Sequence, residues 1–196
     1  MTVDIDGYIK DLRHTITVAA LNYDIWRAYT SEDCRPLYVQ TMNSYSPFFQ
    51  TSLHAHFVAL LVALYRLYEK RTDTFNIPFV LRTLKERKAL PEDTLESLDR
   101  IYEKAKPLWV KVNILRNKAF GHRSSAHTVE GVFKKAGITP NQLRELAELT
   151  KELLNELTQA WDKSTYLFDL DAREATFRLL QDLKCAYEKR KAEPEH

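Results

Sequence analysis

Apolar residues recur at intervals of three and four positions along most of the chain, and this spacing predicts amphipathic α-helices. The first helix is expected within residues 1–30, where apolar positions run from Ile5 to Trp26 and charged residues fill the other face. A second apolar run, from Phe49 to Tyr68, covers more than one side and predicts a central helix. The same spacing predicts a long helix from Leu95 to Leu115. The pattern therefore indicates an all-α fold.

Proline and capping residues indicate where these helices begin and end. N-terminal signals occur at Ser46-Pro47, Asn76-Ile77-Pro78, Leu90-Pro91 and the Thr139–Gln142 capping box. Gly121 and Gly137 are expected to end the helices that precede them. Two more helices are expected over residues 128–136 and 171–190. Together these signals predict an up-and-down helical bundle of about seven to eight helices.

The composition fits a soluble helical protein. Only 4 Gly and 7 Pro occur among 196 residues, which argues against an all-β fold. We expect residues 1–165 to form one helical domain, and residues 166–196 to form a C-terminal helix packed on it and a charged tail. Cys34 and Cys185 lie far apart without metal-binding spacing, which indicates a reducing, cytoplasmic compartment. No secretion signal is recognised, and the apolar stretch Phe57–Tyr65 is too short to cross a bilayer, so no membrane association is expected.

One segment carries an unusual charge pattern. From Lys104 to Val129 there is no Asp or Glu, although 27 acids in 196 residues would place about three or four in a segment of that length. The cations in this gap are Lys104, Lys106, Lys111, Arg116, Lys118 and Arg123. An acid-free basic segment raises the local positive potential, which suits a phosphate ligand. The net charge of +2 by itself neither requires nor excludes a nucleic-acid partner.

Arg116 and His122, both in this segment, are the residue types that metal-free RNA cleavage needs. Histidine titrates near neutral pH, so it can take a proton from a 2′-hydroxyl or give one to the leaving oxygen. Arginine stays charged and can bond two phosphate oxygens, which stabilises the charge of the transition state. Asn117, directly after the arginine, could orient the histidine or hold phosphate.

The six-residue spacing of this pair raises a geometrical difficulty. Six residues of helix turn through about 600°, so the two side chains would point roughly 120° apart. They converge within one chain only if the helix is distorted or ends, and Gly121 is the expected end. Otherwise the site would be shared by two subunits across a two-fold axis. From spacing alone, the alternative is a surface cation and a helix C-terminal cap.

The order Arg116-Asn117, four further residues and His122 resembles the motif of the HEPN superfamily, the higher eukaryote and prokaryote nucleotide-binding domains, which are α-helical bundles. More narrowly, the chain resembles the AbiU-like, abortive-infection branch. That resemblance covers residues 5–165 and rests on Trp26, LLVALYRLYEKR from Leu60, ILRNKAFGHRSS from Ile114 and the segment 129–157. Gly121 departs slightly, because alanine or another small residue is expected there.

The resemblance implies a HEPN-like fold and a dimeric, metal-independent RNA endonuclease of a toxin–antitoxin or phage-defence system. Arg116 and His122 match the catalytic pair, and Asn117, Lys118 and Arg123 would bind the RNA substrate. Neither a metal nor a cofactor is expected, and an antitoxin or a nucleotidyltransferase is the expected kind of partner. The alternative is a non-catalytic helical module that binds a nucleotide, RNA or a partner protein with the same segment.

Other candidate sites are less favourable. His54 and His56 stand two positions apart on a predicted helix, so they point about 200° apart and cannot chelate one metal ion. Helix packing, or a polar contact by one of them, is the expected role. His127 lies near the motif and is a minor candidate. No P-loop, Rossmann glycine pattern or nucleophile elbow occurs in the sequence.

Overall fold

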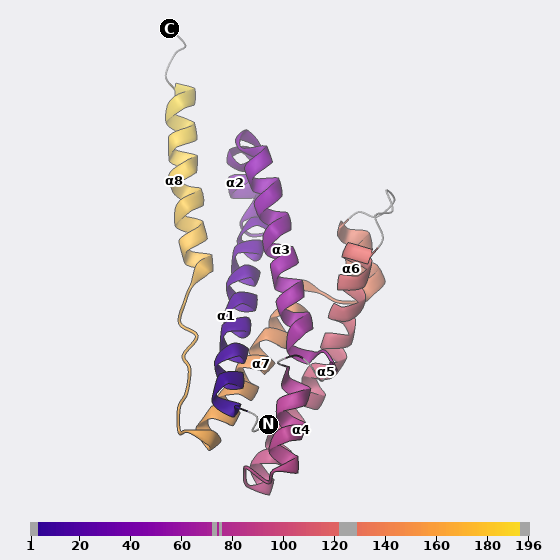
Figure 1. Ribbon diagram of the computed structural model, residues 1–196. Helices are drawn as coiled ribbons and strands as arrows, with labels where there is room; N and C mark the ends of the chain where they lie inside the picture. Colours follow the sequence, from indigo (N-terminus) through magenta and orange to yellow (C-terminus); the bar gives the residue numbers. More distant parts are fainter. Residues whose placement is uncertain (1–3, 72–73, 75, 122–128, 193–196) are drawn as a thin grey trace. The chain divides into compact units, whose positions relative to one another are not determined.

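The computed structural model describes residues 4–71, 74, 76–121 and 129–192, and within 118–121 and 129–132 it describes the helix but not the side chains. Over these ranges the chain forms helices and no strand (Figure 1). The helices are α1 (Ile5–Thr30), α2 (Arg35–Ser44), α3 (Ser46–Tyr68), α4 (Ile77–Glu86), α5 (Glu92–Gly121), α6 (Val129–Ala136), α7 (Pro140–Trp161) and α8 (Ala172–Ala192). The prediction of an all-α helical bundle of about seven to eight helices is confirmed.

The capping signals act locally much as the sequence predicts. The Asn76 side chain accepts a hydrogen bond from the Phe79 amide at 2.9 Å and caps α4. At α7, Thr139 and Gln142 form the predicted capping box. Gly137 follows α6 with a φ of +62°, a left-handed conformation that glycine adopts without strain. Ser46 differs, because it is already the first residue of α3 and its hydroxyl accepts from the Gln50 side chain rather than from the backbone.

The chain divides into two compact units. Unit 1 comprises residues 1–20 and 61–168, and unit 2 comprises residues 21–60 and 169–196. The boundary after residue 20 falls within α1, and the boundary after residue 60 falls within α3. The sequence predicts a different division, with one domain over residues 1–165 and the last helix packed on it, and that division stays a prediction.

The core of unit 1 is built around α5. Helix α5 packs against α4, α6 and, most extensively, α7. Its buried residues follow one another at alternating steps of three and four, which places them in a single stripe: Leu98, Ile101, Ala105, Leu108, Val112 and Leu115. One buried polar link joins α3 to α7, where the Tyr68 hydroxyl and Thr150 Oγ1 are 2.8 Å apart and Thr150 also donates to the Leu146 carbonyl. Burial raises the pKa of Tyr68, so this phenol remains neutral.

Unit 2 has a smaller aromatic core. Tyr29, Phe49 and Leu180, which lie on α1, α3 and α8, are buried together, and the rings of Tyr29 and Phe49 meet edge to face at 5.4 Å. Half-buried residues from all four helices of the unit surround this cluster: Ile25, Tyr38, Met42, Tyr45, Leu53, Phe177 and Leu183. Helix α8 therefore has an apolar face despite its many charges.

Helix α3 is less buried than a central helix would be. It is long and apolar enough to cross a membrane by length and composition, and 28% of that stretch is buried. Its buried side chains concentrate from Leu60 onward, whereas Phe48 is 59% exposed. The prediction that this segment forms a central helix therefore holds only for its last turns, from Leu60 onward.

The buried stripe of α5 gives a stability prediction. Leu115→Ala should lower the free energy of unfolding by about 2–5 kcal/mol, because it opens a cavity at a fully buried position. Leu95→Ala, on the same helix but half-buried, is the matched control and should cost clearly less. Urea unfolding followed by far-UV circular dichroism measures both losses. Equal losses would contradict the packing described for α5.

Candidate functional site

Arg116 and Asn117 lie near the C-terminal end of α5, the helix that carries the acid-free segment. Val112 and Leu115 are fully buried beneath them. Successive residues of a helix point about 100° apart, so the burial of Leu115 directs Arg116 sideways, and its side chain is half-buried. The core of unit 1 therefore fixes the direction in which the arginine leaves the helix.

An aromatic face and an amide hold the Arg116 guanidinium. Its central carbon lies 4.5 Å from the ring centroid of Tyr65 on α3, within the range of a cation–π contact. Its Nη1 donates to Oδ1 of Asn117 at 3.1 Å, and Asn117 Nδ2 donates to Oδ1 of Asn113 at 3.2 Å. No carboxylate forms an ion pair with Arg116 among the residues that the structure describes. The arginine is thus positioned while its positive charge stays uncompensated.

Tyr65 is itself held in place by Trp109. The two rings stack with centroids 6.2 Å apart and an interplanar angle of 27°, and Trp109 Nε1 donates to the Tyr65 carbonyl at 3.2 Å. Sequence reasoning missed Tyr65 and Asn113 as site residues. Spacing could not have found Tyr65, because it lies on a different helix and 51 positions before Arg116. The only signal was its place in the segment LLVALYRLYEKR, which carries part of the family resemblance.

The structure describes only part of the predicted site. His122, Arg123 and His127 lie outside the described residues, and Lys118 belongs to α5 but its side chain is not described. Helix α5 is described as far as Gly121, the residue before His122. The expected helix end at Gly121, and with it the direction of the His122 side chain relative to Arg116, stays a prediction.

Three apolar side chains of unit 1 are exposed near this end of α5. Val110 and Ile114 lie one turn apart on α5 and are 45% and 36% exposed, and Val62 on α3 is 40% exposed. The spacing of Asn113 and Asn117 places their side chains on the same face of the helix as Val110 and Ile114. We call Val110, Asn113, Ile114 and Asn117 the exposed stripe of α5. It combines two apolar groups with two amides and carries no charge.

The cations of the acid-free segment differ in how far their charge is compensated. Lys106 donates to Glu103, just before the segment, at 2.8 Å, and this hydrogen bond raises the pKa of Lys106. Lys111 donates to the neutral Gln142 side chain at 3.3 Å. Arg116 therefore keeps more of its positive charge than Lys106, because it has no acidic partner in the described chain.

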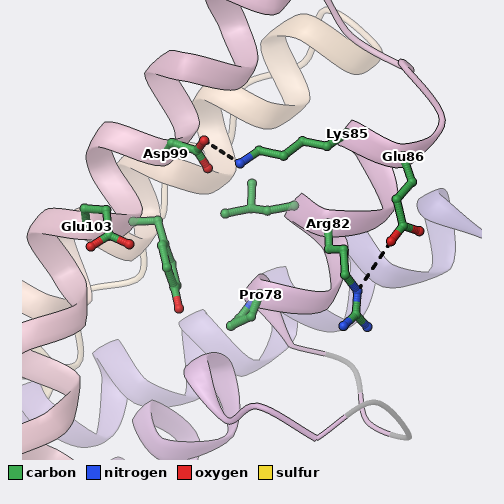
Figure 2. Close-up of a pocket in the computed structure, with 8 residues that line it drawn as sticks. Pro78, Arg82, Lys85, Glu86, Asp99 and Glu103 are labelled. Carbon is green, nitrogen blue, oxygen red and sulfur yellow. Dashed lines mark hydrogen bonds and ion pairs between the residues drawn. The ribbon is translucent and has the colours of Figure 1, made fainter.

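A hollow of about 410 Å³ between α4 and α5 is a separate feature. Its charged residues already pair with one another: in Figure 2, Lys85 reaches Asp99 and Arg82 approaches Glu86. Glu103 adds another negative charge to the lining. Asp99 lies 17 residues before Arg116 on α5, about 25 Å along the helix axis. The hollow is neither part of the Arg116 site nor suited to a phosphate.

The histidines of α3 behave as the sequence predicts. His56 Nδ1 lies 2.8 Å from Oδ1 of Asn22, whereas His54 is exposed. Burial lowers the pKa of His56. One of the two histidines thus makes a polar contact, and no group of three or more histidine, cysteine or acidic side chains suited to a metal ion occurs in the described part of the chain.

Comparison with known proteins gives the family. The sequence model of the HEPN family described as AbiU2 matches residues 2–177, nine-tenths of the chain. No curated protein and no solved structure matches the chain. The match confirms the AbiU-like resemblance and extends it into the last helix. The chain therefore belongs to the AbiU2 family of HEPN domains, an abortive-infection family.

Proposed function

We propose that this protein is a metal-independent RNA endonuclease in which Arg116 and His122 form the catalytic pair. The observation that carries the proposal is the state of Arg116: it is held by Tyr65 and Asn117, with no carboxylate of the described chain to neutralise it. A guanidinium fixed in this way can receive a phosphate group without first breaking an ion pair. Membership of a HEPN family supports the same assignment.

The reaction needs only groups that the chain supplies. His122 takes the proton of the 2′-hydroxyl, and the 2′-oxygen attacks the adjacent phosphorus. The bond from phosphorus to the 5′-oxygen breaks, and that oxygen receives a proton from the protonated imidazole or from water. The products are a 2′,3′-cyclic phosphate and a 5′-hydroxyl. Arg116 stabilises the extra negative charge on the phosphorane, while Asn117, Lys118 and Arg123 hold the flanking phosphates.

The absence of acids between Lys104 and Val129 supports a mechanism without Mg²⁺. Magnesium is bound in proteins through carboxylate oxygens, and this segment offers none. The same absence favours binding of a polyanion, since no carboxylate of the segment repels its phosphates. In the proposed mechanism, the positive charges of arginine and lysine therefore do what a metal ion would otherwise do.

We further propose that the protein acts as a homodimer whose two-fold axis passes near Arg116 and His122. The exposed stripe of α5 supports this arrangement, because Val110 and Ile114 are 45% and 36% exposed and a symmetric contact would bury this apolar surface on both subunits. Two motif segments brought together would also double the positive potential offered to one RNA.

In the cell, the proposed role is that of a toxin or phage-defence component in the cytoplasm. Membership of an abortive-infection family supports this role. A ribonuclease that is toxic to its own cell must be inhibited until it is needed. We propose an antitoxin or a nucleotidyltransferase as the partner that inhibits it.

The catalytic proposal is tested on a mixed single-stranded RNA pool in EDTA. His122→Ala should lose on the order of 10²–10⁴-fold in rate, because general acid–base catalysis is removed. Arg116→Ala should lose a comparable factor through the missing charge on the phosphorane. Lys104→Ala is the matched control: it removes an exposed cation from the same helix and the same acid-free segment and should keep the rate.

The products of the same assay separate the outcomes. The wild type should leave 2′,3′-cyclic phosphate ends, detected by mass spectrometry, with no effect of EDTA. Equal cleavage by all variants would identify a contaminating nuclease and remove the support for the pair. A wild type that binds RNA but does not cleave it, after any co-purified partner has been removed, would instead favour the non-catalytic binding module.

Tyr65 is expected to act as a positioning residue for Arg116. Tyr65→Phe keeps the ring beneath the guanidinium and the carbonyl that Trp109 uses, so its rate should match the wild type. Tyr65→Leu removes the ring and should lower the rate about two- to fivefold, the factor that corresponds to an exposed cation–π contact. Rates at saturating RNA measure the difference. A phenylalanine variant as slow as the leucine variant would show that the ring face does not position Arg116.

The dimer proposal is tested by charging the exposed stripe. The double variant Val110→Asp/Ile114→Asp should be monomeric at micromolar concentration, because two carboxylates would have to be buried in the contact. Leu179→Asp, at an apolar residue of α8 that is 47% exposed, is the control and should remain dimeric. Light scattering measures the mass of each. A monomeric wild type, or an unchanged mass for the double variant, would exclude this interface.

A further inference from the structure

A second basic feature lies in unit 2, where α2 and α8 pack together. The end of α2 and the last turns of α8 enclose a hollow of about 270 Å³, which we call the α2–α8 hollow. Its lining consists of Ser44, Tyr45, Tyr187, Arg190 and Lys191. Two cations and two phenol rings thus meet a hydroxyl in one place, and the lining contains no acid.

The cations of this hollow rest on its tyrosines. The Arg190 guanidinium carbon lies 5.6 Å from the ring centroid of Tyr45, and one of its nitrogens donates to the Tyr45 hydroxyl. Lys191 Nζ lies 5.2 Å from the ring centroid of Tyr187. Hydrogen bonds from Lys191 and Ser44 lower the pKa of Tyr187. Neither cation forms an ion pair with a carboxylate of the described chain, so both positive charges remain available to an anion.

The same surface continues along α2. Lys184 Nζ lies 5.9 Å from the ring centroid of Tyr38, and the Tyr38 hydroxyl donates to the Gln181 side chain at 3.3 Å. Helix α2 contains no acid. Cations in the last turn of α8 interact favourably with the helix dipole, which accounts for their sign. The dipole does not explain why Tyr38 and Tyr45 lie against cations of α8, nor why α2 contains no acid.

The size and chemistry of the hollow favour one kind of ligand. Sites for free small molecules usually enclose about 300–1,000 Å³, and this hollow is smaller and more open. It suits a short part of a longer polyanion rather than a whole cofactor. Proteins that bind single-stranded nucleic acid combine cations for the backbone with aromatic rings on which bases stack. The hollow between α4 and α5 lacks this combination, because its cations are paired with carboxylates.

We propose that the α2–α8 hollow is a second contact for single-stranded RNA, in which Arg190 and Lys191 bind a backbone phosphate and Tyr187 stacks on a base. This inference rests on the proposed ribonuclease function for the identity of the polyanion. It differs from that function in its residues, because none of them belongs to the acid-free segment around Arg116. Binding and cleavage can therefore be measured separately.

The test measures binding of a short, fluorescein-labelled oligouridine by anisotropy, with full-length protein in EDTA. All proteins carry His122→Ala so that the RNA stays intact. Arg190→Ala/Lys191→Ala should weaken binding about tenfold and lower the slope of log K against log salt by about 0.7 for each phosphate that the variant no longer binds. Arg173→Ala/Arg178→Ala is the matched control: it removes two cations from the same helix outside the hollow and should change neither value. Far-UV circular dichroism checks that α8 remains folded.

A second pair of variants tests stacking. Tyr187→Ala should weaken binding about tenfold, whereas Tyr187→Phe should bind like its parent, because the ring face is kept. Unchanged binding by the Arg190/Lys191 variant, or an equal loss in the Arg173/Arg178 control, would overturn the proposal. A parent protein that does not bind the oligouridine would also overturn it. RNA cleavage by the protein with His122 intact is scored separately, so an active nuclease with an unaffected α2–α8 variant would remove only this inference.

Discussion

The site near Arg116 depends on the burial of one stripe of α5. A helix has a fixed phase, so once Leu98 to Leu115 are buried in the core of unit 1, the direction of every other side chain on α5 follows. Arg116 is sent toward α3 and reaches the ring of Tyr65, and Val110 and Ile114 are sent outward. The packing of α5 against α7 therefore determines both the position of the arginine and the location of the exposed stripe.

The protein holds its cations in two different ways, and the difference has electrostatic consequences. Lys85, Arg82 and Lys106 pair with carboxylates, which order the side chains and cancel their charge. Arg82 and Lys106 lie over the rings of Phe79 and Tyr102 as well. Arg116 and Arg190 lie over tyrosine rings, which order the side chains and leave the charge in place. An aromatic support thus keeps a guanidinium ready for a phosphate at little desolvation cost. Arg116 and Arg190 differ from Arg82 and Lys106 in having no carboxylate partner in the described chain, and this difference suits them to a polyanion.

Local sequence signals predicted the fold well. Periodicity identified the helices, and Asn76, the Thr139–Gln142 capping box and Gly137 set their ends, because each acts through hydrogen bonds or backbone conformation within a few residues. Ser46 shows the limit of such signals: a hydroxyl before proline marks a helix start, but α3 follows α2 so closely that the helix begins at the serine itself. A one-residue difference of this kind depends on the chain before it.

Features that depend on contacts between distant residues could not be predicted from the sequence. Neither the ring beneath Arg116 nor the tyrosines beneath Arg190 and Lys184 could be paired with their cations from spacing, since each pair joins residues far apart in the sequence. The two compact units could not be read from the sequence, because their boundaries at residues 20/21 and 60/61 fall inside α1 and α3 and leave no break in their periodicity. The candidate pair itself was visible because both its members lie in one short segment of unusual charge.

The six-residue spacing of Arg116 and His122 bears directly on the proposed dimer. On a continuous helix, Arg116 and His122 would point about 120° apart, and a second subunit would be needed to complete the site. A helix that ended at Gly121 would instead let a single chain bring the two side chains together. The proposed association is supported separately by the exposed Val110 and Ile114. These residues are distinct from the proposed catalytic pair, so the monomeric variant distinguishes the two arrangements: it keeps its cleavage activity if one chain holds the whole site and loses it if the site is shared.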